Sequence, residues 1–272
     1  MCAGQKGGVR PSEEFLAEVR KTAGYLWERG WAEANAGNLS VDLTEGFTAC
    51  DSARSAGAVR LDESYPGLAG RIFFVTGTGR RFRDAAEKPA ENTCLLRMDA
   101  KGAGYDIIWG GEAEGFRPTS ELRSHLRLQE MLRRRNAPAV VVLHAHPTEL
   151  IVLSHLPEYR AEADFNKAIW GIHPETKIAF PRGVGLVPYV LPGSEMLARN
   201  TTETFERGVS VALWETHGCV ALGENLGRAF DLIDTLNKAA KMILMCRSLG
   251  FMPPAPIPER LRELTTAFNL ED

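Results

Sequence analysis

Two histidines stand one residue apart at the end of an apolar run, VVVLHAHP, which begins at Val140. If the run is a strand, His144 and His146 point to the same side of it, because side chains alternate along a strand. Two adjacent imidazoles removed from water both need partners, so the pair could hold a metal ion. A buried histidine is more often structural, and the pair alone leaves both interpretations open.

A third histidine, His217, occurs in WETHGCV, at a turn between two apolar β segments. Alone it would be interpreted as an exposed turn residue. Together with His144 and His146 it suggests a Zn²⁺ site in which three neutral nitrogens leave one or two positions open for a substrate. The remaining histidines have no comparable setting and are assigned to surface or structural roles: His125, His155 and His173.

Two glutamates are candidates for proton transfer. Glu121, in PTSEL, could simply complement the dipole of a helix in its first turn. Facing a three-histidine zinc site, it could instead be a resting fourth ligand that swings away and acts as a base. Glu175, in IHPETKIAF, is either an exposed loop acid or a second proton carrier.

Two glycine loops, NAGN and TGTG, are most simply turns. With Asn38 and Ser120 they would also offer backbone N–H groups and small polar side chains, which are good donors to a phosphate. The sequence has neither a Walker motif nor an arginine cluster beside these loops. A small sugar phosphate therefore fits better than a nucleotide.

The elements that must position these residues follow from periodicity and turn signals. We expect one α/β domain over residues 1–272, a mostly antiparallel sheet covered by helices, because no linker divides the chain and no βαβ rhythm appears. The first half of the chain is expected to contain a helix from Pro11 to about Gly30 capped by Ser12, then strands in NAGNLSVDL, RIFFVTGTGRRF and GYDIIWGG, and a helix starting just after Pro118. The next part is expected to contain a central strand in VVVLHAHP, short strands in TKIAFPRG and VGLVPYVLP, and a helix, strand, turn and strand in ETFERGVSVALWETHGCVALG.

The chain is expected to end with a helix from Leu226 to Leu249, which stops at Gly250 and buries Phe230, Ile233, Leu236, Ala240 and Ile243, and with a tail over 251–272 that has a proline linker and a short helix.

Composition excludes several classes of protein. A 272-residue chain with 44% hydrophobic and 25% charged residues is ordinary for a soluble globule. A net charge of −3 and a pI near 6.1 give no electrostatic case for nucleic acid or an anionic membrane. No apolar run is long enough to span a bilayer, and MCAGQKGGVR shows no secretory h-region. The cysteines form no CxxC pair, and a reducing cytoplasm fits them: Cys2, Cys50, Cys94, Cys219 and Cys246.

Five motifs in order, NAGNLS, VTGTGR, PTSEL, LHAHPT and ETHGCVALG, resemble the class II aldolase/adducin family. The likeness extends from about Lys21 to Phe268. The segments GWAEANAGNLS, DAKGAGYDIIWG and FPRGVGLVPYVLPGSEML are similar to the branch that acts on L-rhamnulose 1-phosphate. Thr78 stands where the family usually has a serine, and segment 45–70 aligns with nothing in the family.

The resemblance implies a central, mainly antiparallel sheet sandwiched by helices in a three-layer α/β/α arrangement, and a homotetramer with active sites near subunit contacts. It implies that one Zn²⁺ per subunit is bound by His144, His146 and His217. It implies that Glu121 is the catalytic acid/base and that Glu175 is a second catalytic glutamate, in its own or a neighbouring subunit's site. The implied phosphate and hydroxyl binders are Asn35, Gly37, Asn38, Thr78, Gly79 and Ser120.

The implied reaction is the reversible aldol cleavage of L-rhamnulose 1-phosphate to dihydroxyacetone phosphate and L-lactaldehyde, with the metal in place of a Schiff-base lysine. The alternatives are cleavage of fuculose phosphate and 4-epimerisation of a pentulose phosphate. A non-catalytic adducin-like interaction domain is a further alternative. Such domains lack a complete histidine set, whereas this chain has all three histidines and Glu121.

Overall fold

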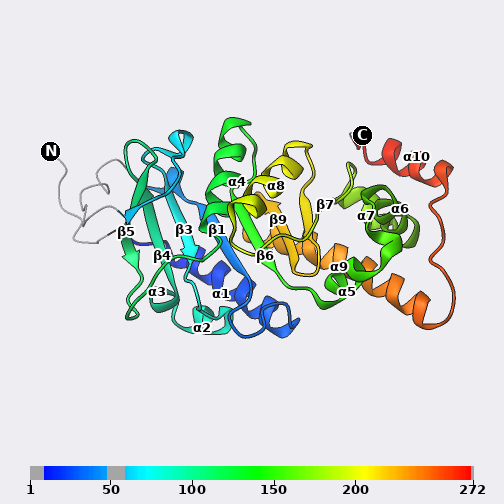
Figure 1. The fold of residues 1–272 in the computed structure, drawn as a ribbon, viewed down its shortest axis with the longest axis horizontal. Helices are drawn as coiled ribbons and strands as arrows, with labels where there is room; N and C mark the ends of the chain where they lie inside the picture. Colours follow the sequence, from blue (N-terminus) through cyan, green and yellow to red (C-terminus); the bar gives the residue numbers. More distant parts are fainter. Residues whose placement is uncertain (1–8, 48–58, 271–272) are drawn as a thin grey trace.

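A computed structural model describes residues 9–47 and 59–270, and one twisted sheet runs through this part of the chain (Figure 1). The described strands are β1 (Asn38–Asp42), β2 (Val59–Arg60), β3 (Ile72–Thr76), β4 (Thr93–Met98), β5 (Gly104–Gly110), β6 (Val141–Ala145), β7 (Gly185–Val187), β8 (Val211–Trp214) and β9 (Gly218–Gly223). Their order is β2-β5-β4-β3-β1-β6-β9-β8-β7. Among these strands every pair is antiparallel except β7 and β8, which confirms the expected mainly antiparallel sheet.

Helices cover both faces of this sheet. The described α-helices are α1 (Glu13–Glu28), α2 (Phe82–Glu87), α3 (Pro89–Asn92), α4 (Leu122–Arg134), α5 (Thr148–His155), α6 (Glu162–Ile172), α7 (Pro174–Ala179), α8 (Glu195–Glu206), α9 (Leu226–Ser248) and α10 (Pro258–Ala267). The largest apolar cluster joins α1, α5, α6 and α9 to one face of the sheet, and two smaller clusters join α4 and α8 to the other. The result is the expected three-layer arrangement.

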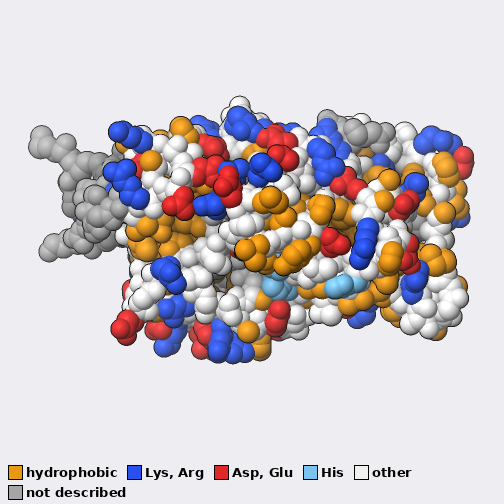
Figure 2. All heavy atoms as spheres, viewed as in Figure 1, with side chains coloured by type: hydrophobic (Ala, Val, Ile, Leu, Met, Phe, Trp, Pro, Cys, Tyr) orange, Lys and Arg blue, Asp and Glu red, His pale blue; other side chains and the backbone are white. Residues whose placement is uncertain are grey.

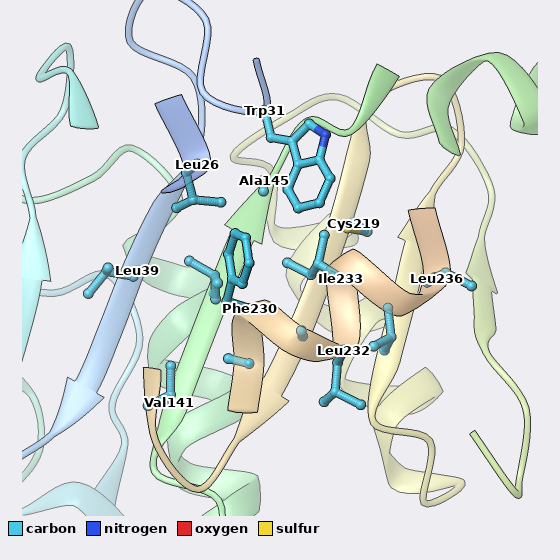
Figure 3. Packing of buried hydrophobic residues seen from close by; sticks show 14 of the residues in the cluster. Leu26, Trp31, Leu39, Val141, Ala145, Cys219, Phe230, Leu232, Ile233 and Leu236 are labelled. Atoms are coloured by element: carbon cyan, nitrogen blue, oxygen red, sulfur yellow. The ribbon is translucent and has the colours of Figure 1, made fainter. Parts of the chain in front are cut away.

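The alternation of side chains along β6 decides which face carries the site. Val141, Leu143 and Ala145 pack into the cluster beneath α9, whereas Val142 belongs to the cluster beneath α4 and α8. Figure 3 shows Phe230 of α9 against this apolar side of the sheet. His144 is two residues after Val142, so its side chain points to the same face of the sheet, the one covered by α4.

The two long helices at the ends of the chain form as their sequences predict. Ser12 caps α1 by accepting a hydrogen bond of 3.1 Å from the backbone N–H of Phe15. All five residues expected on the buried face of α9 are buried. Gly250 follows α9 with a φ of +84°, the left-handed conformation in which helices commonly end.

One predicted helix start and one predicted strand were wrong. The helix after Pro118 begins only at Leu122, because the backbone of Thr119 bonds to Thr76 and holds this segment alongside the end of β3. In TKIAFPRG the expected strand is the second half of α7. Pro174 starts that helix, and the hydroxyl of Thr176 donates to the backbone carbonyl of Ile169, 2.6 Å away.

Several features named from the sequence fall partly or wholly outside the described residues. Cys2, Cys50 and the first eight residues of the chain lie outside them. Of segment 45–70, the described parts include a short edge strand, β2, which pairs with β5. Within residues 9–47 and 59–270, no helix is both long and apolar enough to cross a bilayer.

Candidate metal centre

Three imidazoles converge at one end of β6. His144 is the second-to-last residue of β6, and His146 follows the end of this strand. His217 lies in the turn between β8 and β9. Their nearest ligand atoms all lie within 4.8 Å of one another, and the Nε2 atoms of His144 and His146 are 3.0 Å apart. These three residues are the predicted set, and the structure brings all of them together.

The sheet register and one glycine create this convergence. Antiparallel pairing places His144 opposite Val220 of β9, so the turn that precedes β9 lies beside the end of β6. A Cβ on Gly218 would lie 2.5 Å from the carbonyl oxygen of Ala145 and 2.9 Å from the ring of His146. Only glycine allows the turn to approach this closely, which brings His217 to the other two rings.

The outer nitrogens of two rings are held by partners that fix the tautomer. Nδ1 of His144 donates to the carbonyl of Cys219 at 2.9 Å, and Nδ1 of His146 donates to the Glu33 carboxylate at 3.0 Å. Each Nε2 then carries a lone pair, and these lone pairs face each other. A divalent cation satisfies such a donor set, and the second partner on each ring is the usual arrangement around a bound metal. The residues present therefore fit a metal ion.

Burial favours the neutral form, which binds metal, in His144 and His217. It lowers the pKa of His217 to about 4, with a further contribution from His146. Burial, followed by the neighbouring His146 and His217, lowers the pKa of His144 well below its ordinary value. Neutral imidazoles need release no proton to accept a cation near neutral pH.

Glu121 lies directly against these rings. One carboxylate oxygen is 3.7 Å from Nε2 of His144 and the other is 3.9 Å from Nε2 of His217. The residue is only 5% exposed and immediately precedes α4, so its side chain points into the site rather than serving the first turn of the helix. Burial raises the pKa of Glu121, whereas the hydrogen bond from Asn38 lowers it.

One glycine loop contacts this carboxylate, and the other lies beside the segment that leads to it. Asn38 is paired with His144 in the sheet, and its side-chain amide donates to Glu121 at 2.9 Å. The backbone N–H of Thr78 donates to the carbonyl of Arg117, so the TGTG loop runs beside the segment that carries Ser120. Ser120 is exposed.

Other predicted residues lie at the rim or elsewhere. Asn35 and Gly79 are exposed in their loops, and Gly37 adopts a φ of +76° against the backbone of His144. Glu175 is exposed in the first turn of α7, a helix that packs on α6, α9 and α10. Within the described residues the histidine group does not include Glu175.

Sequence reasoning missed two residues that support the site. Glu33 lies in the same loop as NAGN, where an acid within GWAEANAGNLS was the available signal. His125 was assigned a surface or structural role without a link to the site. It is buried and bonded to Asn38, which contacts Glu121. The signal there was the i, i+4 spacing of His125 and Gln129, which puts both on one face of α4.

The site opens to the surface. The side chains of His146 and His217 are 16% and 18% exposed, whereas that of His144 is 2% exposed. Figure 2 shows histidine side chains reaching the surface near the middle of one face, below a band of hydrophobic side chains. A small molecule can therefore reach the open side of the three rings.

Residues 17–244 match the family described as the class II aldolase and adducin N-terminal domain. The chain is 37% identical over 257 residues to a rhamnulose-1-phosphate aldolase of Bacteroides thetaiotaomicron, covering 93% of each chain. It is 34% identical to a protein of the same name from Klebsiella pneumoniae, covering 94% of each. Its structure is similar to a sugar-phosphate aldolase of Thermotoga maritima, with a TM-score of 0.77, 33% identity, and coverage of 88% of this chain and 97% of that one.

Proposed function

The chain belongs to the class II aldolase and adducin family, and we propose that it cleaves L-rhamnulose 1-phosphate reversibly to dihydroxyacetone phosphate and L-lactaldehyde. The observation that carries this proposal is the placement of the Glu121 carboxylate beside two of three converging imidazoles, those of His144 and His217. The curated relatives named for this reaction match the chain over more than nine tenths of its length. The enzyme is an aldehyde-lyase of the metal-dependent class.

The metal would be held by His144, His146 and His217. We propose Zn²⁺, because three neutral imidazoles with open positions are typical of catalytic zinc sites. When bound, the metal supplies a Lewis acid that stabilises negative charge on substrate oxygens. The fixed tautomers of His144 and His146 keep their Nε2 lone pairs aimed at the centre.

Glu121 is proposed to handle the proton at the carbon. When the C3–C4 bond of the ketose breaks, the hydroxyl at C4 must lose a proton and C3 must gain one. Burial raises the pKa of Glu121, which suits a group that holds a proton and returns it to C3. Asn38 keeps one oxygen of this carboxylate in place by its 2.9 Å hydrogen bond.

A second proton carrier is needed at the C4 oxygen, and we propose Glu175 of a neighbouring subunit. Glu175 is exposed and stands apart from the histidine group of its own chain, as an acid that serves another chain would. The apolar side chains of Tyr189, Leu191 and Met196 are also 60%, 69% and 53% exposed, which supports a covering subunit. We propose a homotetramer, tested by light scattering, in which this apolar surface is buried.

The phosphate and hydroxyl groups of the substrate are assigned to the two glycine loops and the segment before α4. The proposed residues are Asn35, Gly37, Asn38, Thr78, Gly79 and Ser120. The NAGN loop leads into β1 and the TGTG loop follows β3. These two strands are paired, and this adjacency supports the assignment. A cytoplasmic location is part of the same proposal and is supported by free cysteines at Cys94, Cys219 and Cys246.

The experiment is a panel of sugar 1-phosphates and pentulose phosphates with identification of the products. Rhamnulose 1-phosphate should give dihydroxyacetone phosphate and an aldehyde at the highest kcat/KM. Preferred cleavage of fuculose 1-phosphate, or an isomerised pentulose phosphate without aldehyde, would reassign the substrate. Inactivity on the whole panel in metal-loaded protein would contradict the aldolase assignment and favour an interaction domain.

A further inference from the structure

A row of buried polar side chains leads from α4 through β1 to Glu121. We call it the polar row: Gln129, Ser40, His125, Asn38 and Glu121. Its contacts are Gln129 Nε2 to Ser40 Oγ at 3.1 Å, Ser40 Oγ to His125 Nδ1 at 2.9 Å, His125 Nε2 to Asn38 Oδ1 at 2.5 Å, and Asn38 Nδ2 to Glu121 Oε2 at 2.9 Å. Every member is less than a tenth exposed.

The donor and the acceptor of each hydrogen bond in the polar row can be assigned by starting from Glu121. The Glu121 carboxylate only accepts, so the amide NH₂ of Asn38 faces it and the amide oxygen faces His125. That oxygen needs a donor, which makes Nε2 of His125 the protonated nitrogen. Nδ1 of His125 must then accept, and the hydroxyl of Ser40 donates to it.

Gln129, at the end of the polar row away from Glu121, fixes the orientation of the Ser40 hydroxyl. The hydroxyl oxygen of Ser40 accepts from Nε2 of Gln129, which also donates to the carbonyl of Val140 at 3.1 Å. Burial lowers the pKa of His125 to about 3, in agreement with a ring that carries one proton. Each group therefore has one hydrogen-bonding orientation, and the orientation of Asn38 depends on His125.

We propose that His125 is a positioning residue for the aldol reaction, holding the Asn38 amide so that its N–H groups always face Glu121. Without that constraint the amide can turn its oxygen toward the carboxylate, and Glu121 loses the donor that keeps it beside the histidines. The inference rests on the proposed function. It assigns to the histidine of α4 a part in placing the proton carrier, at a distance from the substrate.

The variants His125→Leu and His125→Gln test this role. Glutamine can present an N–H near the position of Nε2, whereas leucine presents none. We expect His125→Leu to lower kcat by about 10- to 100-fold with KM and zinc content close to those of the wild type. His125→Gln should recover most of the loss, and His155→Leu, at an exposed histidine of α5, should leave kcat unchanged.

A double-mutant cycle separates positioning from general stability. In an Asn38→Ala background, His125→Leu should lower kcat no further, because the two changes remove the same constraint. If His125→Leu fails to fold, Ser40→Ala tests the same row with a smaller change and should lower kcat in the same sense. Wild-type kcat in folded, zinc-loaded His125→Leu, or equal losses in the leucine and glutamine variants, would overturn the proposal.

A structural readout does not depend on activity. Crystal structures should show the contact of 2.9 Å between Asn38 and Glu121 kept in His125→Gln and broken in His125→Leu. An unchanged contact in His125→Leu would overturn the inference even if wild-type protein cleaved no sugar phosphate. Inactive wild type with a broken contact in the leucine variant would instead reject the proposed function alone.

Discussion

The carboxylate of Glu33 lies 3.0 Å from Nδ1 of His146. Glu33 comes from the loop after α1, more than a hundred residues before His146 in the chain, and Ala34 next to it adopts a left-handed backbone with a φ of 47°. The contact holds the ring with its Nε2 toward His144, and a carboxylate partner of this kind is usual for a histidine that binds metal. The loop that carries the NAGN motif therefore also supports the metal centre from outside.

Replacing Glu33 should weaken the metal site without removing a ligand. We expect Glu33→Gln to lower the affinity for Zn²⁺ by about 10- to 100-fold, measured by competition with a chromogenic chelator. Glu28→Gln, at an exposed glutamate near the end of α1, is the matched control and should bind like the wild type. Equal affinities in the two variants would show that Glu33 plays no part in the site.

Glu121 should give the opposite pattern, because its proposed role is proton transfer to the substrate rather than metal binding. Glu121→Gln should keep its zinc and slow the cleavage of rhamnulose 1-phosphate by about 10²- to 10⁴-fold. Zinc content and kcat are measured on the same preparation, with Glu112→Gln, at an exposed glutamate, as the control. Undiminished turnover would remove Glu121 from its assigned role.

Gly37 joins the NAGN loop to the candidate metal centre through a close backbone approach. A Cβ there would lie 3.0 Å from both the carbonyl oxygen of His144 and the ring of Phe82. Gly30 has a similar φ of +72° but no atom within 4 Å of its Cβ position, so it isolates the backbone cost.

We expect Gly30→Ala to lower the free energy of unfolding by about 1–2 kcal/mol, because alanine disfavours the left-handed conformation. Gly37→Ala should cost about 1–3 kcal/mol more, because His144 or Phe82 must shift. Urea denaturation of metal-free protein measures both. Equal losses in the two variants would mean that the loop moves away without strain.

The buried histidines should make the metal-free protein sensitive to mild acid. In the unfolded chain these histidines become protonated below their ordinary pKa of 6.5. In the folded chain burial lowers the pKa of His125 to about 3 and that of His217 to about 4. The unfolded state therefore binds more protons in this window, and the free energy of unfolding should fall from pH 7 to pH 5. Glu121, whose pKa is raised, acts in the opposite direction.

Urea denaturation at pH 7, 6 and 5 in the presence of a chelator measures this slope. His125→Gln removes one of the groups and should show a shallower fall than the wild type. Glu121→Gln removes the opposing group and should show a steeper one. A free energy of unfolding that stays level or rises toward pH 5 would contradict the assignment of buried, neutral histidines.

The sequence was sufficient for the parts of the site that depend on local pattern. The i, i+2 spacing of His144 and His146 at the end of an apolar run predicted that both rings point to the same side. The position of His217 in a turn between two β segments predicted that its ring joins them. The order of the five motifs predicted the three-layer fold. In each case short-range geometry or resemblance carried the information.

Contacts made by docking of distant elements were not accessible in this way. Glu33 reaches His146 only because the loop after α1 folds over the end of β6, and His125 reaches Asn38 only because α4 packs across β1. The helix in TKIAFPRG was missed because its isoleucine and phenylalanine favour a strand. Pro174 at the start of the helix and the hydrogen bond from the Thr176 hydroxyl to the carbonyl of Ile169 favour the helix instead.

The central claim is that His144, His146 and His217 together hold one divalent cation on which cleavage depends. The direct measurement is to strip the protein with a chelator, confirm its fold by circular dichroism, and titrate Zn²⁺ while following aldehyde release from rhamnulose 1-phosphate. We predict no cleavage without metal and full activity at about one equivalent of zinc per chain. Wild-type cleavage by the folded, metal-free protein would contradict the account.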